Sequence, residues 1–156
     1  RVDIAVRILV ADDEPNTRDA LAEVLREEEH FVTTVSGGRL AVESLEASQY
    51  DLVITDLNMP DVDGIEVIET TRALQPSAAI VVITAYGERF SRSFLEKGEA
   101  VLLSKPFRLN EILRVVEAVG RRLADRGAVG PALSSVSVSV SPPAGSAGMG
   151  EMVEPR

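Results

Sequence analysis

Five short, mostly apolar runs recur along this chain, and stretches with helical spacing separate them. The runs cover residues 8–11, 31–35, 52–55, 80–83 and 101–103. Several are continuously apolar and rich in β-branched residues, which is typical of parallel strands covered on both faces. Strands that alternate with helices predict an α/β fold with a doubly wound parallel sheet.

The segments between the runs carry helical signals. The last segment places four apolar residues at the i, i+3, i+4 and i+7 positions of one helix stripe: Leu109, Ile112, Leu113 and Val116. Further back, Asp63 precedes Glu66 by three residues, which is the spacing of a capping box and predicts a helix start. Right-handed crossovers then place helices on both faces of the sheet.

The residue inventory excludes several kinds of site. The chain has no cysteine and one histidine, so disulfides, thiol nucleophiles, cysteine zinc sites and multi-histidine metal sites are ruled out. The net charge is −9, of which −8 falls on residues 1–126, and an acidic body repels phosphate backbones. We therefore expect no direct nucleic-acid binding by this segment. No apolar window reaches about 18 residues and no signal peptide is visible, so we expect a cytoplasmic protein without a membrane span.

The composition changes after Arg126. The remaining residues are rich in Gly, Ser, Pro and Ala and show no helical period. We expect residues 1–126 to form one domain and residues 127–156 to form a flexible or disordered linker or tail. Within that tail, residues 136–140 alternate valine with serine, a pattern that is also able to pair as an edge strand.

Polar side chains follow the apolar runs where the predicted strands end. Asp12 and Asp13 follow the first run, Asp56 the third and Thr84 the fourth, and Lys105 comes shortly after the fifth. Doubly wound sheets bind ligands beyond the carboxyl ends of their strands, so we expect these side chains to converge. Two carboxylates about 5 Å apart repel each other by roughly 3 kcal/mol at an effective dielectric of 20. The predicted cluster therefore requires a cation.

The residue types at this rim favour phosphoryl chemistry. Carboxylate oxygens select a hard divalent ion, and Mg²⁺ fits better than Ca²⁺ because it needs few carboxylates and accepts phosphate oxygens. Lys105 supplies a mobile positive charge and Thr84 supplies a hydroxyl donor. Together with Mg²⁺ these groups stabilise a transferring phosphoryl group. In their midst, Asp56 can act as a nucleophile and form an acyl phosphate.

Four segments occur in the order and at the spacing of a known family: ILVADDEP, DLVITDLNMPDVDG, IVVITAYG and LLSKPF. Through them, residues 7 to about 123 resemble the receiver domain of two-component response regulators. The resemblance implies a flavodoxin-like (βα)5 sheet with strand order 2-1-3-4-5. It also implies a phosphorylation-controlled switch with slow self-dephosphorylation rather than a metabolic enzyme.

The resemblance assigns roles to the acidic cluster. Asp56 would take a phosphoryl group from the phosphohistidine of a sensor histidine kinase or phosphotransfer protein. Asp13 would bind Mg²⁺ directly, while Asp12 would help through water. Asp56 and the backbone carbonyl of Asn58 would complete the protein ligands of the ion.

Further positions border the phosphoryl group in the family. Thr84 and Lys105 would contact its oxygens, and Pro106 would follow a cis peptide bond that fixes the approach of the lysine. Tyr86 would lie beside the group, as would the side chain two residues after the phosphoacceptor; alternatively, Tyr86 begins the fourth helix. Gly64 permits a turn into the third helix, or is an ordinary loop glycine.

Leu102 departs from the family pattern, which places Tyr, Phe or His three residues before the lysine. In the family, a threonine and this aromatic residue together couple phosphorylation to the output surface. This chain has the threonine, Thr84, but not the aromatic residue. Our hypothesis is that phosphorylation changes the fourth helix and fifth strand more weakly or by another route. The face formed by the fourth helix, fifth strand and fifth helix, about residues 86–123, is the expected partner or dimer surface.

Two other residues have plainer interpretations. Glu14 precedes Pro15 and is interpreted as part of a helix start rather than as a metal ligand. His30 follows an acidic run away from the rim, so we interpret it as neither a phosphohistidine nor a ligand.

Alternative functions remain at this point. A phosphatase of the haloacid-dehalogenase type uses similar groups, but it needs a second aspartate where this chain has Asn58. A stand-alone receiver acts only through protein contacts, whereas a full regulator carries an output domain. The start at Arg1 favours a trimmed fragment, and the ITAYG and LSKPF contexts resemble receivers of transcription regulators.

Overall fold

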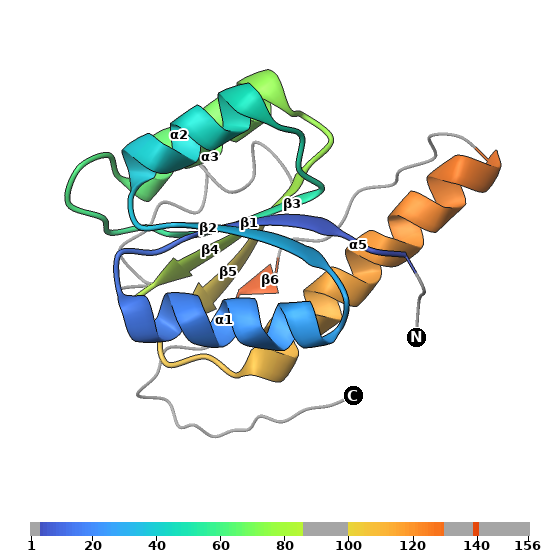
Figure 1. Ribbon diagram of the computed structural model, residues 1–156, viewed down its shortest axis with the longest axis horizontal. Helices are drawn as coiled ribbons and strands as arrows, with labels where there is room; N and C mark the ends of the chain where they lie inside the picture. The colour runs from blue at the N-terminus through green and yellow to red at the C-terminus, as the bar shows by residue number, and fades with distance from the viewer. Residues whose placement is uncertain (1–3, 86–99, 130–138, 141–156) are drawn as a thin grey trace.

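A parallel sheet lies between two layers of helices in the computed structural model, which describes residues 4–85, 100–129 and 139–140 (Figure 1). The described strands are β1 (Arg7–Ala11), β2 (Phe31–Val35), β3 (Leu52–Asp56), β4 (Ala79–Thr84), β5 (Ala100–Ser104) and β6 (Ser139–Val140). The described helices are α1 (Pro15–Glu27), α2 (Gly38–Ala47), α3 (Gly64–Leu74) and α5 (Leu109–Val129).

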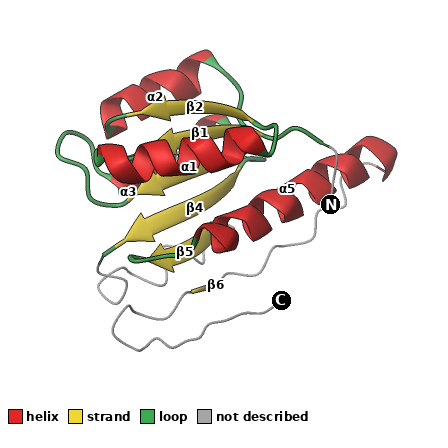
Figure 2. Cartoon of the chain, turned by 60° about the horizontal axis from the view of Figure 1, so that its bottom comes forward, coloured by secondary structure: helices red, strands yellow, loops and turns green. Residues whose placement is uncertain are grey.

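The strand order is β2-β1-β3-β4-β5-β6, and every neighbouring pair is parallel. The predicted order 2-1-3-4-5 is therefore confirmed for the five main strands. β6 adds two residues at the outer side of β5, inside the valine–serine segment (Figure 2). The strand order reverses between β1 and β3, which places the carboxyl ends of these two strands at the switch point of the sheet.

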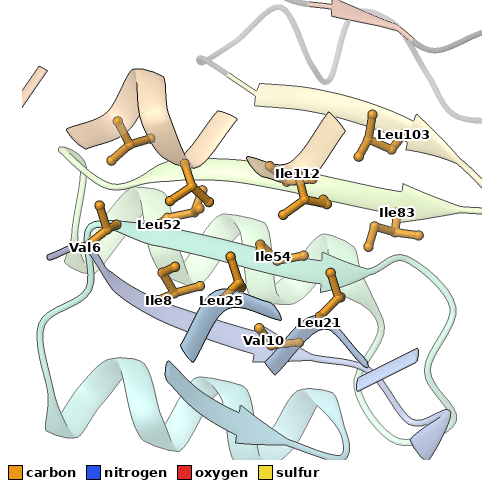
Figure 3. Packing of buried hydrophobic residues seen from close by; sticks show 13 residues of the cluster. Val6, Ile8, Val10, Leu21, Leu25, Leu52, Ile54, Ile83, Leu103 and Ile112 are labelled. Carbon is orange, nitrogen blue, oxygen red and sulfur yellow. The ribbon is translucent and has the colours of Figure 1, made fainter. Parts of the chain in front are cut away.

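Successive residues of each strand pack against opposite helical layers. On the side of α1 and α5, thirteen buried residues form the larger cluster, among them Ile8, Ile54 and Ile112 (Figure 3). On the side of α2 and α3, the strands pack through two smaller clusters that include Leu9, Val53 and Leu102. Burial on both faces explains why the strands read as continuous apolar runs rather than as alternating ones.

Local capping fixes where the helices begin. The Glu14 carboxylate accepts a hydrogen bond from the backbone N–H of Thr17 (2.8 Å), ahead of Pro15 at the first position of α1. The Asp63 carboxylate accepts from the backbone N–H of Glu66 (3.2 Å) at the start of α3. Both predicted helix starts are confirmed, and each cap satisfies a backbone donor that the helix itself leaves unpaired.

The last helix crosses the domain boundary predicted after Arg126, because α5 continues to Val129. The apolar stripe predicted for this helix is confirmed, with Ile112 and Val116 buried in the larger cluster. Apart from the end of α5 and β6, the predicted tail lies outside the described residues. Within the described ranges, no helix combines the length and the apolar character that crossing a membrane requires.

Candidate functional site

The carboxyl ends of β1 and β3 bring three acidic side chains together. Asp12 and Asp13 directly follow β1, and Asp56 is the last residue of β3. One carboxylate oxygen from each of the three lies within 4.8 Å of the others. Asp12 and Asp56 are buried, with 1% and 4% of their surface exposed, whereas Asp13 is exposed. The predicted convergence of these carboxylates is confirmed.

Lys105 reaches the same cluster from the loop after β5. Its Nζ donates a hydrogen bond to Oδ2 of Asp56 at 3.0 Å, and the pair is only partly exposed. Burial opposes the charge on the lysine, but the hydrogen bond to Asp56 and the nearby carboxylates outweigh it and raise the pKa of Lys105. The lysine is therefore held as a cation against the carboxylate.

The buried Asp12 carboxyl is suited to a metal ion. Its Oδ1 accepts from the backbone N–H of Glu14 (2.9 Å), while its Oδ2 is buried and has no hydrogen-bond partner among the described residues. Burial raises the pKa of Asp12 to about 6; the hydrogen bond from Glu14 counters this rise and the charge of Asp56 adds to it. A buried oxygen without a partner, beside two further carboxylates, fits a hard divalent cation.

The backbone around Asp56 fixes its carboxylate. The backbone N–H of Asn58 donates to Oδ1 of Asp56 at 3.0 Å, while Oδ2 receives the lysine. The backbone N–H of Leu57 donates to the carbonyl of Ile83 (2.8 Å), which ties the loop to the end of β4. Both oxygens of Asp56 are thus oriented toward the rim of the sheet.

Thr84 and Lys105 are joined through the backbone. Thr84 is the last residue of β4 and is fully buried, and it lies one residue beyond the partner of Asp56 in the strand register. Its carbonyl accepts a hydrogen bond from the backbone N–H of Lys105 at 2.9 Å. The Lys105–Pro106 peptide bond is cis, as predicted. Tyr86 lies outside the described residues.

Gly64 acts by the absence of a side chain rather than by an unusual turn conformation. A Cβ atom at this position would meet the carbonyl oxygen of Asp56 and come within 2.7 Å of the Cα of Leu57. The Gly64 N–H donates to the carbonyl of Leu57 at 2.9 Å. The first turn of α3 therefore packs directly against the backbone that carries Asp56, and only glycine leaves room for this contact.

Two supporting residues were missed in the sequence. Arg18 of α1 donates from Nη1 to the carbonyl of Asp12 at 2.9 Å, which holds the loop after β1. Asp61, in the loop after β3, accepts from the backbone N–H groups of Gly38 (3.0 Å) and Arg39 (3.2 Å) and so caps α2. Neither contact follows from a local sequence pattern; in the loop after β3, only Asp63 was predicted as a helix cap.

The remaining sequence predictions concern residues outside the cluster. Leu102 is buried in the cluster on the α3 side of β5, with 2% of its surface exposed. His30 accepts a hydrogen bond at Nδ1 from the backbone N–H of Val6 (3.0 Å), where it supports the start of β1, at the opposite end of the strand from the acidic cluster. This structural role agrees with the interpretation that His30 is not a ligand of the site.

Comparison with protein families gives one domain match. The family model described as the response regulator receiver domain matches residues 8–117. Among curated relatives, the transcriptional regulatory protein TcrA of Mycobacterium tuberculosis is 39% identical over 118 residues, covering 75% of this chain and 47% of TcrA. CutR of Streptomyces coelicolor, also a transcriptional regulatory protein, is 36% identical over 118 residues, with 75% and 54% covered. The chain thus spans about half the length of these relatives.

Solved structures give the same match. The response regulator TrrA of Thermotoga maritima, in complex with Mg²⁺-BeF, shares 35% identity with a TM-score of 0.65; the match covers 73% of this chain and 98% of TrrA. The receiver domain of a sensor histidine kinase from Pseudomonas aeruginosa shares 28% identity with a TM-score of 0.66, covering 76% and 99%. That structure holds a magnesium ion coordinated in the active site cleft.

Proposed function

The chain belongs to the response regulator receiver domain family, and on that premise we propose that Asp56 accepts a phosphoryl group and thereby switches the domain. The observation that carries the proposal is the environment of Asp56. Its buried carboxylate is held by Lys105 and by the N–H of Asn58, beside the carboxylates of Asp12 and Asp13. The complex of the related response regulator TrrA with Mg²⁺-BeF supports the same chemistry.

In the proposed reaction a carboxylate oxygen of Asp56 attacks the phosphorus of a phosphohistidine on a partner kinase or phosphotransfer protein. A phosphorus–oxygen bond forms, the phosphorus–nitrogen bond breaks, and the released imidazole takes up a proton. Lys105 leaves the carboxylate and contacts the oxygens of the phosphoryl group, and the hydroxyl of Thr84 donates to the same group. Hydrolysis of the acyl phosphate by water later resets the switch.

The metal proposed for this site is Mg²⁺, held by Asp12, Asp13, Asp56 and the backbone carbonyl of Asn58. When bound, it neutralises charge on the phosphoryl oxygens and on the three carboxylates. The fit rests on the buried, unpartnered oxygen of Asp12 and on the close approach of the three carboxylates. The magnesium ion in the Pseudomonas aeruginosa receiver domain supports this assignment.

We further propose that the switch controls an attached or partner output module, with a transcriptional output. The matched relatives TcrA and CutR are named as transcriptional regulatory proteins, and each is about twice as long as the segment that matches. The surface read by the output is proposed to include β5 and α5; the predicted fourth helix lies outside the described residues.

The direct test is phosphorylation by a small acyl phosphate in the presence of Mg²⁺, followed by intact mass measurement. We expect one adduct of about 80 Da, the mass of a single phosphoryl group. Asp56→Asn should abolish it. Asp63→Asn is the matched control, because asparagine caps a helix as well as aspartate does and the phosphoacceptor is untouched. An adduct that persists in Asp56→Asn would overturn the assignment.

Mg²⁺ is expected to stabilise the fold without any phosphoryl donor. A cation at the three carboxylates offsets their repulsion, and an ion at a hundred times its Kd adds about 2.7 kcal/mol to the free energy of unfolding. Thermal unfolding with and without Mg²⁺ measures this gain. Asp13→Asn should remove most of it, whereas Asp19→Asn, on an exposed part of α1, should retain it. An equal gain in both variants would contradict a metal site at the cluster.

A further inference from the structure

The outer edge of β5 is occupied by a later segment of the same chain. β6 runs parallel to β5, with Ser139 opposite Val101 and Val140 opposite Leu102. Figures 1 and 2 both show β6 at the outer edge of the sheet, next to β5. β5, which carries Leu102 where the family places an aromatic residue, is therefore not an open edge in this protein.

The two edges of the sheet are protected in different ways. At the β2 edge, Arg26 of α1 donates from Nη2 to the backbone carbonyl of Val32 at 2.9 Å, so a side chain satisfies an edge acceptor. At the β5 edge the chain supplies backbone from β6 instead. Unpaired edges attract other strands, and natural sheets commonly cover them. The β5 edge thus accepts strands, and the chain carries its own occupant for it.

The direction of β6 follows from the path of the chain. β5 ends at the rim that carries the acidic cluster, and α5 returns the chain to the opposite end of the sheet (Figure 2). A strand that follows this helix can therefore run parallel to β5, as in the βαβ unit. The segment 136–140 is uncharged and alternates valine with serine, and valine is favoured in strands.

We propose that β6 is an intramolecular strand ligand of the β5 edge, and that phosphorylation of Asp56 weakens its binding. While bound, β6 covers an edge of the surface proposed for the output partner. This inference rests on the proposed function for its regulatory half. Its structural half, the occupied edge, stands on the pairing of β6 with β5.

The coupling runs along β5 itself. Leu102 pairs with Val140 in β6, and Lys105, three residues further on, holds Asp56. The backbone N–H of Lys105 is also bound to the carbonyl of Thr84. When the lysine exchanges its carboxylate partner for a phosphoryl group, the end of β5 must adjust. The β6 ladder has only two paired residues, so such an adjustment is able to break it.

Hydrogen exchange of the complete, unphosphorylated chain tests the structural half. We compare peptides covering β5 in the wild type, in Val140→Pro and in the control Ser146→Pro. Proline cannot pair in the β6 ladder, so Val140→Pro should speed exchange in β5 by about fivefold, the factor contributed by one net backbone hydrogen bond. The control should match the wild type. Equal exchange in all three proteins would overturn the proposal that β6 occupies this edge.

Addition of Mg²⁺ and beryllofluoride, a phosphoryl mimic, tests the regulatory half. Exchange in β5 of the wild type should rise toward that of Val140→Pro, and Val140→Pro itself should change little there. An unchanged wild type would overturn the regulation. The adduct of about 80 Da is measured separately. If the adduct forms and β5 exchange does not respond, the inference fails alone; if β6 protects β5 and no adduct forms, the proposed function fails alone.

Discussion

Gly64→Ala is expected to destabilise the protein by about 1–3 kcal/mol, the usual cost of forcing extra atoms into a packed interior. An alanine at the start of a helix normally stabilises it by up to about 1 kcal/mol relative to glycine. The expected destabilisation is therefore opposite to the effect that helix propensity alone predicts. The reason is the contact with backbone: the added Cβ would lie 2.7 Å from the Cα of Leu57 and against the carbonyl of Asp56. Neither atom can move without displacing β3 or α3.

Urea unfolding of Gly64→Ala measures this loss, and Gly37→Ala is its matched control. The atoms nearest to a Cβ at Gly37 are the carboxylate atoms of Asp61, at 2.9–3.2 Å, and a side chain yields more easily than a backbone. We expect a smaller loss in the control. We also expect Gly64→Ala to slow phosphorylation, because any shift of Asp56 disturbs its contact with Asn58. If Gly64→Ala unfolded at the same urea concentration as the wild type, the close packing of α3 on β3 would be contradicted.

The strands were predictable because burial on both faces leaves an apolar run in the sequence. The run at residues 31–35 coincides with β2, while the other strands extend one or two residues beyond their predicted runs. The additional residues, such as Asp56 and Ser104, are polar or small and join the sheet through their backbone. Backbone pairing leaves no side-chain signature, so a pattern of apolar residues locates the centre of a strand better than its end.

The acidic cluster was predictable for a different reason, which is topological. Once the strands are parallel, residues that follow their carboxyl ends must share one rim, however distant they are in the sequence. The supporting contacts do not obey this rule. Arg18 and Asp61 bind backbone groups of other segments, and Gly64 is fixed by a close approach of two backbones. Such contacts depend on how elements pack, which no local spacing encodes.

Lys105→Gln is expected to change two properties of the site in opposite directions. In the absence of a ligand the lysine neutralises Asp56 through a contact of 3.0 Å, and its pKa is raised by that carboxylate. The same cation repels Mg²⁺ and competes with it for the Asp56 oxygen. Removing the charge should therefore tighten Mg²⁺ binding by up to about fivefold, the range measured for partly exposed ion pairs.

The phosphorylation rate should fall in the same variant. The proposed role of Lys105 is to bind the phosphoryl oxygens as charge develops on them, and loss of one such contact typically slows a reaction by about 100-fold or more. Calorimetric Mg²⁺ titration and the time course of the mass adduct measure the two effects on one protein. Arg108→Gln, an exposed cation three residues further along the chain, controls for the general loss of positive charge. If Lys105 only supported the fold, its replacement would weaken Mg²⁺ binding and slow phosphorylation together. Tighter Mg²⁺ binding combined with slower phosphorylation would instead show that Lys105 moves from Asp56 to the phosphoryl oxygens during the reaction.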